Sequence, residues 1–439
     1  MQASTFMQVA IDSARAVRGR TSPNPWVGAV VVRDGKVVSV GATAPYGGPH
    51  AEAAALAGVD ARGATLYTTL EPCMPFEGKR TRPCAEAIIE AGVSRVVISL
   101  SDPHTPVRGQ GAAFLRAQGV QVDLGDGSEA VTELLRPYLK FRQTGLPYVI
   151  AKFAVSLDGK VGAPLAGITW LTSEPALARA HSDRAWVDAI LVGSGTVLAD
   201  DPALTAREAG SLLARQPLRV ILDGRGRTDP AARVLGPGAL VVTSKSSPQW
   251  RRAVAATGAE FLELEYREAG VDLRELLRAL GQRDIVSLIA EGGPSVLASL
   301  FDGGHVDEVH AYVAPLILGP AGIPLVPSGA RAGPVRPPRS RDRTASPGCP
   351  HSRIHRRLVA VERPVAPTRE SFGAMNMPMP SREPSPCTIR DASGGRPVCP
   401  ATATAGTAGS AAEGTHGTNE RTRLLHAGGS APLPARSHR

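Results

Sequence analysis

The chain has 439 residues, more than one ordinary core accommodates and enough for two or three domains. Hydrophobic residues make up 43% and charged residues 20%, which is typical of globular proteins. The formal net charge of +9 comes from residues 331–439, which hold 17 arginines, no lysine and 7 acidic residues. The rest of the chain has 32 basic and 33 acidic residues and is therefore almost neutral. A near-neutral body excludes the basic field with which a protein attracts nucleic acid.

The first 145 residues alternate helical and strand patterns, which predicts a layered α/β domain over 1–145. In chain order the patterns predict a helix over 4–18, a hairpin over 27–41 that turns at Asp34-Gly35, a helix over 50–59, a strand over 64–70, a helix over 84–93, a strand over 95–100 and a helix–turn–strand unit over 111–125.

A second α/β domain is predicted over 146–330. It begins at the segment 147–162. Its predicted elements are then a helix over 174–186, strands over 189–195, 219–223 and 239–244, a helix over 270–280, a strand over 285–293, a helix over 294–302 and a strand over 308–315.

Residues 331–439 differ from the rest of the chain in composition. Leu, Ile, Val and Phe account for 12 of these 109 residues and Pro for 15. Such a segment is too poor in apolar residues to bury a core, so we expect a disordered tail that supplies no buried strand. The second domain is then expected to lack the last strand of its sheet.

The sequence carries no sign of a membrane or secreted protein. No stretch approaches the roughly 18 consecutive apolar residues of a membrane span, and the N-terminal residues lack the basic start and apolar run of a signal peptide. Five cysteines are an odd number, and three of them (Cys349, Cys387 and Cys399) fall in 331–439, which argues against a disulfide framework. We therefore expect a cytoplasmic protein with no membrane partner.

Four residues of the first domain have the spacing of a zinc deaminase site. His50 and Glu52 open a predicted helix, Cys73 follows a predicted strand, and Cys84 opens the next helix. Zinc deaminases need three such ligands, an open fourth position for water, and a nearby carboxylate that is not a ligand. Zinc lowers the pKa of its water to about 7, and Glu52 would move the proton to the leaving ammonia. Each residue alone is usually structural, and only the combined spacing favours one zinc ion in this domain.

Five segments of this domain resemble the bifunctional riboflavin-biosynthesis deaminase/reductase family. They are SPNPWVGAVVV (22–32), GGPHAEAAAL (47–56), LYTTLEPC (66–73), GKRTRPC (78–84) and VVISLSDPH (96–104). The resemblance implies a cytidine-deaminase-like three-layer domain with zinc at His50, Cys73 and Cys84 and with Glu52 as proton shuttle. One departure is the loop between the cysteines, which has ten residues and no His where the family usually has eight and a His.

The second domain resembles the reductase half of the same family, which has a dihydrofolate-reductase-like fold. The segments are KFAVSLDGKVG (152–162), TWLTS (169–173), 181–207 and LIAEGGPSVLASL (288–300). From the residues alone, the strand–Gly-Gly–helix pattern at 291–295 offers backbone N–H groups to a phosphate, although a plain turn would look the same. Arg184 and Arg207 could each bind a phosphate through two hydrogen bonds, or they could be surface charges.

The resemblance implies contacts for NADPH and for a phosphorylated pyrimidine. The expected cofactor contacts are Ala154, Trp170, Thr196, Asp200, Gly224, Gly293, Pro294, Ser295, Val296, Leu297, Ala298 and Ser299. The expected substrate contacts are Ile168, Arg184, Leu204, Arg207 and Glu291. Ile168 and Gly224 stand where the family commonly has Ser, which removes one hydroxyl contact at each position.

The function expected is a two-step conversion by an enzyme that binds no nucleic acid. Zinc-dependent deamination of a diamino-ribosylaminopyrimidinone phosphate is followed by NADPH-dependent reduction of its ribosyl group to ribityl, with the reductase impaired by its missing strand. One alternative is a nucleoside or tRNA deaminase with an inactive appended domain. Another is a non-catalytic zinc-binding module, against which Glu52 argues. The sequence leaves open whether the chain forms a homo-oligomer.

Overall fold

The computed structural model describes residues 3–74, 82–104, 108–163, 171–267, 270–325 and 355–360. One compact unit spans Met1–Pro367 and holds two sheets with their helices, and Thr368–Arg439 lies outside the described residues. None of the helices in the described part of the chain is both long enough and apolar enough to cross a bilayer.

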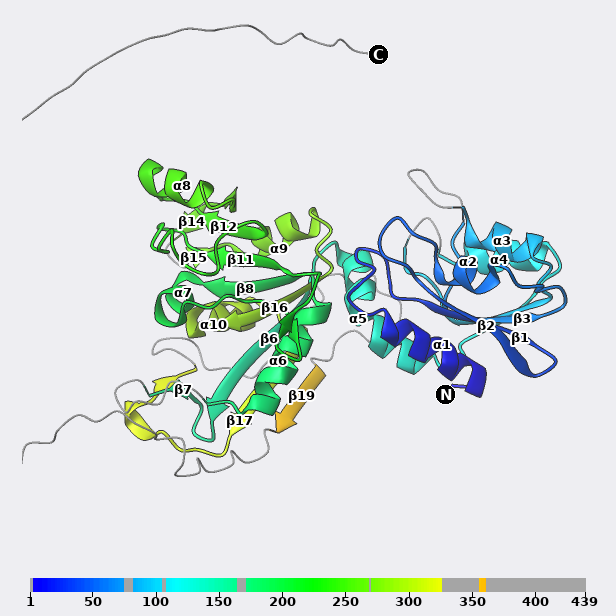
Figure 1. Cartoon of the computed structure of the whole chain (residues 1–439), viewed down its shortest axis with the longest axis horizontal. Coiled ribbons are helices and arrows are strands. Elements are labelled where there is room, and N and C mark those ends of the chain that lie inside the picture. Colours follow the sequence, from blue (N-terminus) through cyan, green and yellow to red (C-terminus); the bar gives the residue numbers. More distant parts are fainter. Residues whose placement is uncertain are drawn as a thin grey trace, which may run out of the picture. The chain divides into compact units, whose positions relative to one another are not determined.

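The first sheet has five strands in the order β2-β1-β3-β4-β5. Strand β1 is antiparallel to β2 and β3, whereas β3, β4 and β5 run parallel. Figure 1 shows two helices, α1 and α5, on one face of this sheet and three, α2, α3 and α4, on the other, which is the predicted three-layer arrangement. The strands are β1 (Gly28–Arg33), β2 (Lys36–Ala42), β3 (Thr65–Leu70), β4 (Arg95–Leu100) and β5 (Gln121–Leu124), and the helices are α1 (Thr5–Ala16), α2 (Ala51–Leu56), α3 (Cys84–Glu90), α4 (Gln110–Ala117) and α5 (Ser128–Thr144).

The local sequence explains most of these elements. Asp34 and Gly35 both have positive φ, 49° and 69°, as the two central residues of a tight hairpin turn require, so the predicted hairpin is confirmed. Helix α5 is not among the predicted elements, because Pro137 in its middle counts against a helix. Its seven buried residues, among them Leu134 and Tyr138, nevertheless form one apolar stripe.

The second sheet has eight strands in the order β13-β12-β11-β8-β16-β6-β17-β19, with every neighbouring pair parallel. The predicted two-domain α/β fold class is thereby confirmed. The strands are β6 (Tyr148–Ser156), β8 (Ala189–Gly193), β11 (Leu218–Leu222), β12 (Ala239–Thr243), β13 (Glu260–Glu263), β16 (Ser287–Gly292), β17 (Glu308–Ala314) and β19 (His355–Ala360), and the helices are α6 (Glu174–Trp186), α7 (Ser194–Asp200), α8 (Pro248–Ala255), α9 (Leu273–Gly281) and α10 (Pro294–Asp302).

Short elements complete this domain. Three small two-stranded pairs are β7 (Lys160–Gly162) with β18 (Ile323–Pro324), β9 (Arg207–Glu208) with β10 (Ser211–Leu212), and β14 (Tyr266–Arg267) with β15 (Gly270–Val271), and a 3-10 turn covers Gly319–Ala321. The predicted strand over 189–195 is too long, because α7 begins at Ser194. Helix α8 and strand β13 are not predicted, although Ser247 caps α8 and Pro248 opens it.

The expectation that the second sheet lacks its last strand is wrong. His355–Ala360 forms β19, which pairs with β17 from Glu308 to Val313 and ends the sheet. The segment RRLVAV at 356–361 is a short apolar run that the average composition of a 109-residue tail conceals. A strand of six residues needs only such a local run. Of the expected tail, only 355–360 lies within the described residues.

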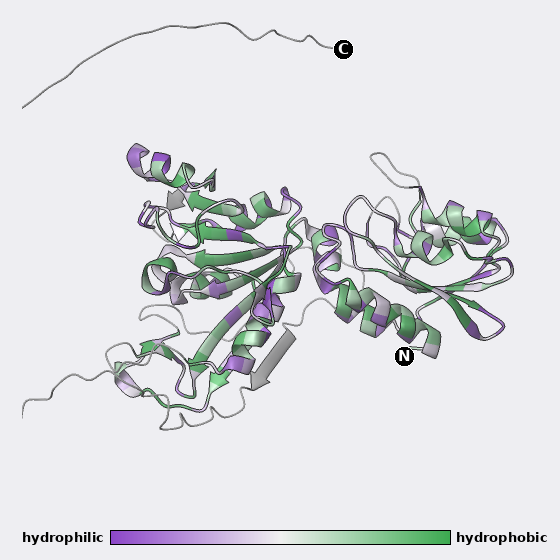
Figure 2. Cartoon of the chain, in the orientation of Figure 1, coloured by the Kyte–Doolittle hydropathy of each residue, from purple (hydrophilic) through white to green (hydrophobic). Residues whose placement is uncertain are grey.

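Burial follows the strand patterns. Strands β8 and β12 are buried at every residue, as strands covered on both faces of a parallel sheet are. Figure 2 shows hydrophobic residues gathered along the strands of both sheets. Because parallel strands all end at the same edge, residues that follow β6, β8, β11 and β16 are brought together there.

Candidate active sites

Three side chains of the first domain meet at helix and strand ends. His50 caps α2, Cys84 is the first residue of α3, and Cys73 follows β3. The Nδ1 atom of His50 lies 3.4 Å from Sγ of Cys73 and 3.4 Å from Sγ of Cys84, and all three ligand atoms lie within 4.8 Å of one another. Tetrahedral zinc with ordinary Zn–N and Zn–S distances places such atoms about 3.5 Å apart, so the three residues fit a zinc ion.

The chemistry of the cysteines also suits a metal. The Cys84 backbone N–H donates to Sγ of Cys73 over 3.4 Å. Hydrogen bonding from Cys84 outweighs burial and, together with His50, lowers the pKa of the Cys73 thiol to about 3. The thiolate is the form that binds metals, so this ligand is already in its binding state at neutral pH.

Glu52 lies in the first turn of α2, next to the three ligand atoms but not one of them. Its residue is only 3% exposed, and Thr68 Oγ1 lies 3.5 Å from its Oε1. Burial, followed by the negative charge of Cys73, raises the pKa of Glu52. A carboxyl group with a raised pKa can hold and release a proton near neutral pH.

Two further carboxylates behind this site are not predicted from the sequence. Glu71 accepts hydrogen bonds from the backbone N–H groups of Asp102, Gly109 and Ala112, at 3.0–3.2 Å, and so fixes the chain that follows β4. Asp102 accepts from the hydroxyl of Tyr138 at 3.0 Å, and burial raises its pKa to about 6. Glu71 belongs to the segment LEPC and Asp102 to the segment SDPH. An acidic residue just after a predicted apolar strand is the sequence feature that could have indicated them.

The second domain holds a cavity of about 660 Å³ at the carboxyl ends of its parallel strands. Eleven of the expected contact residues line it: Ala154, Thr196, Asp200, Gly224, Glu291, Gly293, Pro294, Ser295, Val296, Leu297 and Ser299. Ala298 lies in α10 but does not line the cavity, nor do Arg184, Leu204 and Arg207. Trp170 and Ile168 lie outside the described residues.

Two glycine-capped helices open onto this cavity. Helix α7 follows Gly193 and α10 follows Gly293, and neither cap residue has a side chain that bonds the first turn. A Cβ on Gly193 would lie 3.0 Å from Cγ2 of Val296, so a larger residue there would require the Val296 side chain to shift by a few tenths of an ångström. The backbone N–H groups left at such helix starts bind phosphates, which fits a dinucleotide such as NADPH.

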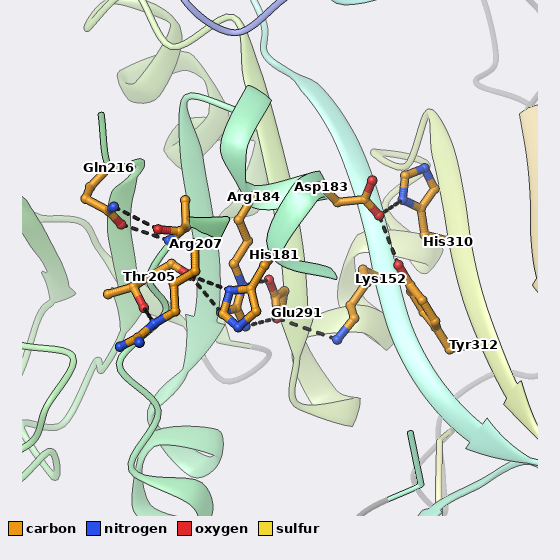
Figure 3. Close-up of polar contacts among 11 residues, drawn as sticks. Lys152, His181, Asp183, Arg184, Thr205, Arg207, Gln216, Glu291, His310 and Tyr312 are labelled. Carbon is orange, nitrogen blue, oxygen red and sulfur yellow. Dashed lines mark hydrogen bonds and ion pairs between the residues drawn. The ribbon is translucent and has the colours of Figure 1, made fainter. Parts of the chain in front are cut away.

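Arg184 does not point its guanidinium to solvent. Its Nε and Nη2 donate to the two carboxylate oxygens of Glu291, at 2.6 and 2.8 Å. Burial opposes ionisation of Glu291, but the charges of Lys152 and Arg184 outweigh it and lower the pKa of Glu291 to about 2. The paired donors that the sequence assigns to a phosphate are therefore bound to Glu291 (Figure 3).

A short segment brings the other expected substrate contacts beside α6. The carbonyl oxygen of Thr205 accepts from Nη1 of Arg184 at 3.1 Å and lies 2.9 Å from Nδ1 of His181. Leu204, with a positive φ of 50°, is buried. Nε of Arg207 donates to Thr205 Oγ1 at 3.1 Å and its Nη1 donates to the carbonyl of Gly210, which aims this guanidinium along the segment.

Three of the cavity residues that the sequence did not single out are basic. Lys152 lies on β6, two residues before Ala154, and its Nζ is 3.7 Å from Oε2 of Glu291. Arg225 and Arg227 follow β11, and Nη2 of Arg227 donates to Ser194 Oγ at 2.7 Å. Lys152 is in the quoted segment KFAVSLDG, whereas nothing local marks the two arginines as cavity residues.

Comparisons with known proteins agree with both sites. The model of the cytidine and deoxycytidylate deaminase zinc-binding region matches residues 1–100, and the model of the RibD C-terminal domain matches residues 147–341. Riboflavin biosynthesis protein RibD of Bacillus amyloliquefaciens is 41% identical over 330 residues, which are 74% of this chain and 87% of the relative. The Escherichia coli protein of the same name is 38% identical over 334 residues, 73% of this chain and 89% of the relative.

Solved structures give the same result. The structure of Acinetobacter baumannii RibD, form 1, is similar with a TM-score of 0.66 and 36% identity, covering 73% of this chain and 89% of that one. A deaminase/reductase from Thermotoga maritima is similar with a TM-score of 0.65 and 35% identity, covering 76% and 92%. Because these likenesses run through both domains, neither a nucleoside or tRNA deaminase with an inactive appended domain nor a non-catalytic zinc-binding module is favoured. The chain therefore belongs to the RibD family of bifunctional riboflavin-biosynthesis enzymes, with a zinc-dependent deaminase domain and an NADPH-dependent reductase domain that act on a small pyrimidine.

Proposed function

We propose that the N-terminal domain, over 1–145, deaminates a diamino-ribosylaminopyrimidinone phosphate, and that the C-terminal domain then reduces its ribosyl group to ribityl. The observation that carries the first step is the meeting of His50, Cys73 and Cys84 beside the buried Glu52, which is not a ligand. A purely structural zinc site would not need such a carboxylate.

In the deaminase, His50, Cys73 and Cys84 would hold the zinc ion. When bound, zinc supplies a water that is acidic enough to attack a ring carbon at neutral pH. Glu52 takes a proton from that water and gives it to the amino group, which leaves as ammonia while the ring carbon becomes a carbonyl. Burial of Glu52 suits this role because it raises the pKa of the carboxyl group toward neutrality.

In the reductase, NADPH supplies the hydride that C1 of the ribosyl group accepts. The bond between C1 and the ring oxygen breaks, and that oxygen needs a proton to become a hydroxyl of ribityl. Lys152 lines the same cavity as Ala154, an expected nicotinamide contact, and Glu291, an expected substrate contact, and within the described residues its ammonium makes no hydrogen bond. We assign Lys152 as the donor of this proton, with Arg184 holding Glu291 in place.

Two arginines support a preference for NADPH over NADH. Arg225 and Arg227 line the cavity after β11, where Gly224 leaves only a backbone contact. Guanidinium groups bind phosphate through charge-assisted hydrogen bonds, and NADPH has one more phosphate than NADH. Arg207 is the corresponding candidate for the phosphate of the substrate. A cytoplasmic location follows from the same proposal, because thiols that bind zinc persist in a reducing compartment.

The test uses the full chain with both half-reactions assayed separately. Cys84→Ala should lose the zinc and the release of ammonia, while oxidation of NADPH with a pre-deaminated substrate continues at the wild-type rate. Cys387→Ala, which changes a cysteine outside the described residues, is the matched control and should retain one zinc per chain. Full retention of zinc by Cys84→Ala would overturn the assigned metal site.

A further inference from the structure

Strand β17 directs three polar side chains to one face of its sheet. Glu308, His310 and Tyr312 alternate along the strand, and His310 is paired in register with Lys152 of β6, Tyr312 with Ala154. Residues paired in register lie on the same face, so Tyr312 stands on the face on which Lys152 enters the cavity. Tyr312 is only 1% exposed, and the cavity does not reach it.

The ammonium group of Lys152 lies between a carboxylate and an aromatic ring. Its Nζ is 3.7 Å from Oε2 of Glu291 and 5.5 Å from the centre of the Tyr312 ring (Figure 3). The first distance is longer than that of a hydrogen-bonded ion pair, about 2.8 Å, and the second is within the range of a cation–π contact. The ammonium therefore lies between the ring and a carboxylate whose two oxygens already accept hydrogen bonds from Arg184.

Tyr312 itself is held by a buried network of charges. Its hydroxyl donates to Oδ2 of Asp183 at 3.1 Å, and the same oxygen lies 2.9 Å from Nδ1 of His310. Nε2 of His310 lies 2.8 Å from Oε1 of Glu308, so both ring nitrogens face carboxylates and both carry a proton. Nε of Arg179 approaches the other Asp183 oxygen to 3.3 Å. This hydrogen bond holds the Tyr312 ring beside Lys152.

We propose that Tyr312, anchored by Asp183 and His310, is the positioning residue that keeps the Lys152 ammonium free to reach the sugar during reduction. The proposal rests on the role of Lys152 proposed above. A lysine side chain has four flexible carbons and no planar group to orient it, so neighbours must fix its position. Without the ring, the Lys152 ammonium would move toward Glu291 and donate its N–H groups to that carboxylate instead of to the sugar.

The experiment measures kcat and KM for NADPH oxidation by the full chain with deaminated substrate. Tyr312→Met removes the ring, and we expect kcat to fall roughly ten- to hundred-fold, as for a catalytic group displaced by about 1 Å, while KM for NADPH changes less than about two-fold. Tyr312→Phe keeps the ring but loses the hydrogen bond to Asp183, so its kcat should fall, although less than that of Tyr312→Met. Tyr148→Phe is the matched control, because its buried hydroxyl donates to Glu308 at 3.0 Å in the same network without touching Lys152, and its kcat should stay at the wild-type value.

A double-mutant cycle separates positioning from a merely structural role. Lys152→Met alone should lower kcat at least about hundred-fold, and adding Tyr312→Met should then lower it no further, because the two residues act as one unit. If Lys152→Met keeps its rate, the role proposed for Lys152 fails. If Lys152→Met loses its rate but Tyr312→Met does not, or if the two losses multiply, the positioning role of Tyr312 is overturned. If Tyr312→Met does not fold, Tyr312→Phe and Asp183→Asn replace it in the cycle. A further loss of kcat when either variant is added to Lys152→Met would then overturn the positioning role of Tyr312.

Discussion

Removal of Arg184 tests how much the buried ion pair with Glu291 contributes to the reductase domain. Arg184→Met keeps most of the side-chain volume and leaves the carboxylate with Lys152 alone, at 3.7 Å. The Glu291 side chain is 6% exposed and that of Arg184 15%, so water cannot replace the lost partner. The variant therefore has a buried charge that is only partly compensated.

The size of the effect follows from the pKa of Glu291. A carboxyl group whose pKa falls from 4.5 to about 2 on folding contributes about 3 kcal/mol at neutral pH. Breaking a buried pair costs about 3–5 kcal/mol, and we expect the lower end because Lys152 remains. For a domain of this size the melting temperature should fall by roughly 6–12 °C. Because the folded pKa is lowered, this stability is present above pH 4.5 and is lost as the pH falls toward 2, so wild type and variant should converge there.

The assay is calorimetry of the full chain, in which the reductase transition is the one that NADPH shifts upward. Glu291→Gln with Arg184→Met is the companion variant, since it removes both charges and should recover most of the lost stability while NADPH oxidation stays low. An unchanged melting temperature for Arg184→Met at neutral pH would refute the reasoning. A double variant less stable than Arg184→Met would refute it equally.

The other sites give predictions of the same kind. Glu52→Gln should retain zinc and fold but release ammonia at least about 10²-fold more slowly, with NADPH oxidation of deaminated substrate unchanged, and near-normal ammonia release would remove Glu52 from the mechanism. Arg227→Leu should raise KM for NADPH but not for NADH, and an equal rise for both would show that this guanidinium does not read the extra phosphate. Burial opposes the charge of His310, but Asp183 and Glu308 raise its pKa from 6.5 to about 9, so its stabilisation is complete below pH 6.5 and is lost as the pH rises through 9. His310→Gln should therefore flatten the fall in the reductase melting temperature over that range, and an unchanged slope would contradict this reading.

Local sequence was sufficient where a site depends on residues close in the chain. His50, Glu52, Cys73 and Cys84 are separated by one strand and two helix starts, so their spacing alone predicts that they meet. The glycine turns before α7 and α10 are equally local, and most of the expected cofactor contacts line the cavity.

The cluster around Glu291 could not be predicted in the same way. Lys152, Asp183, Glu291, His310 and Tyr312 come from four elements, and only the order of strands β16-β6-β17 places them together. The alternating pattern of β17 predicts which of its side chains share a face of the sheet. It does not predict which strands lie next to β17, because parallel pairing joins strands that are far apart in the chain. For the same reason the sequence leaves Arg184 as either a phosphate ligand or a surface charge, whereas its partner in the fold is a carboxylate.

Strand β19 leads to the last prediction, because it replaces the expectation of an incomplete sheet. A chain that ends at Leu325 leaves the β17 edge from Glu308 to Val313 without a partner, whereas one that ends at Pro367 keeps β19 and the whole compact unit. Each net hydrogen bond contributes about 1 kcal/mol, so on the order of five lost bonds cost several kcal/mol against a typical total of about 5–15 kcal/mol. His310 and Tyr312 lie on the edge that would be exposed, so NADPH oxidation and the reductase melting temperature should both fall in the 1–325 chain and be normal in 1–367. Ammonia release should be the same in both chains, because the deaminase has its own sheet and its three metal ligands all belong to that domain. If the two chains oxidise NADPH equally fast and melt together, the pairing of β19 contributes nothing to the reductase, and its sheet is complete at β17.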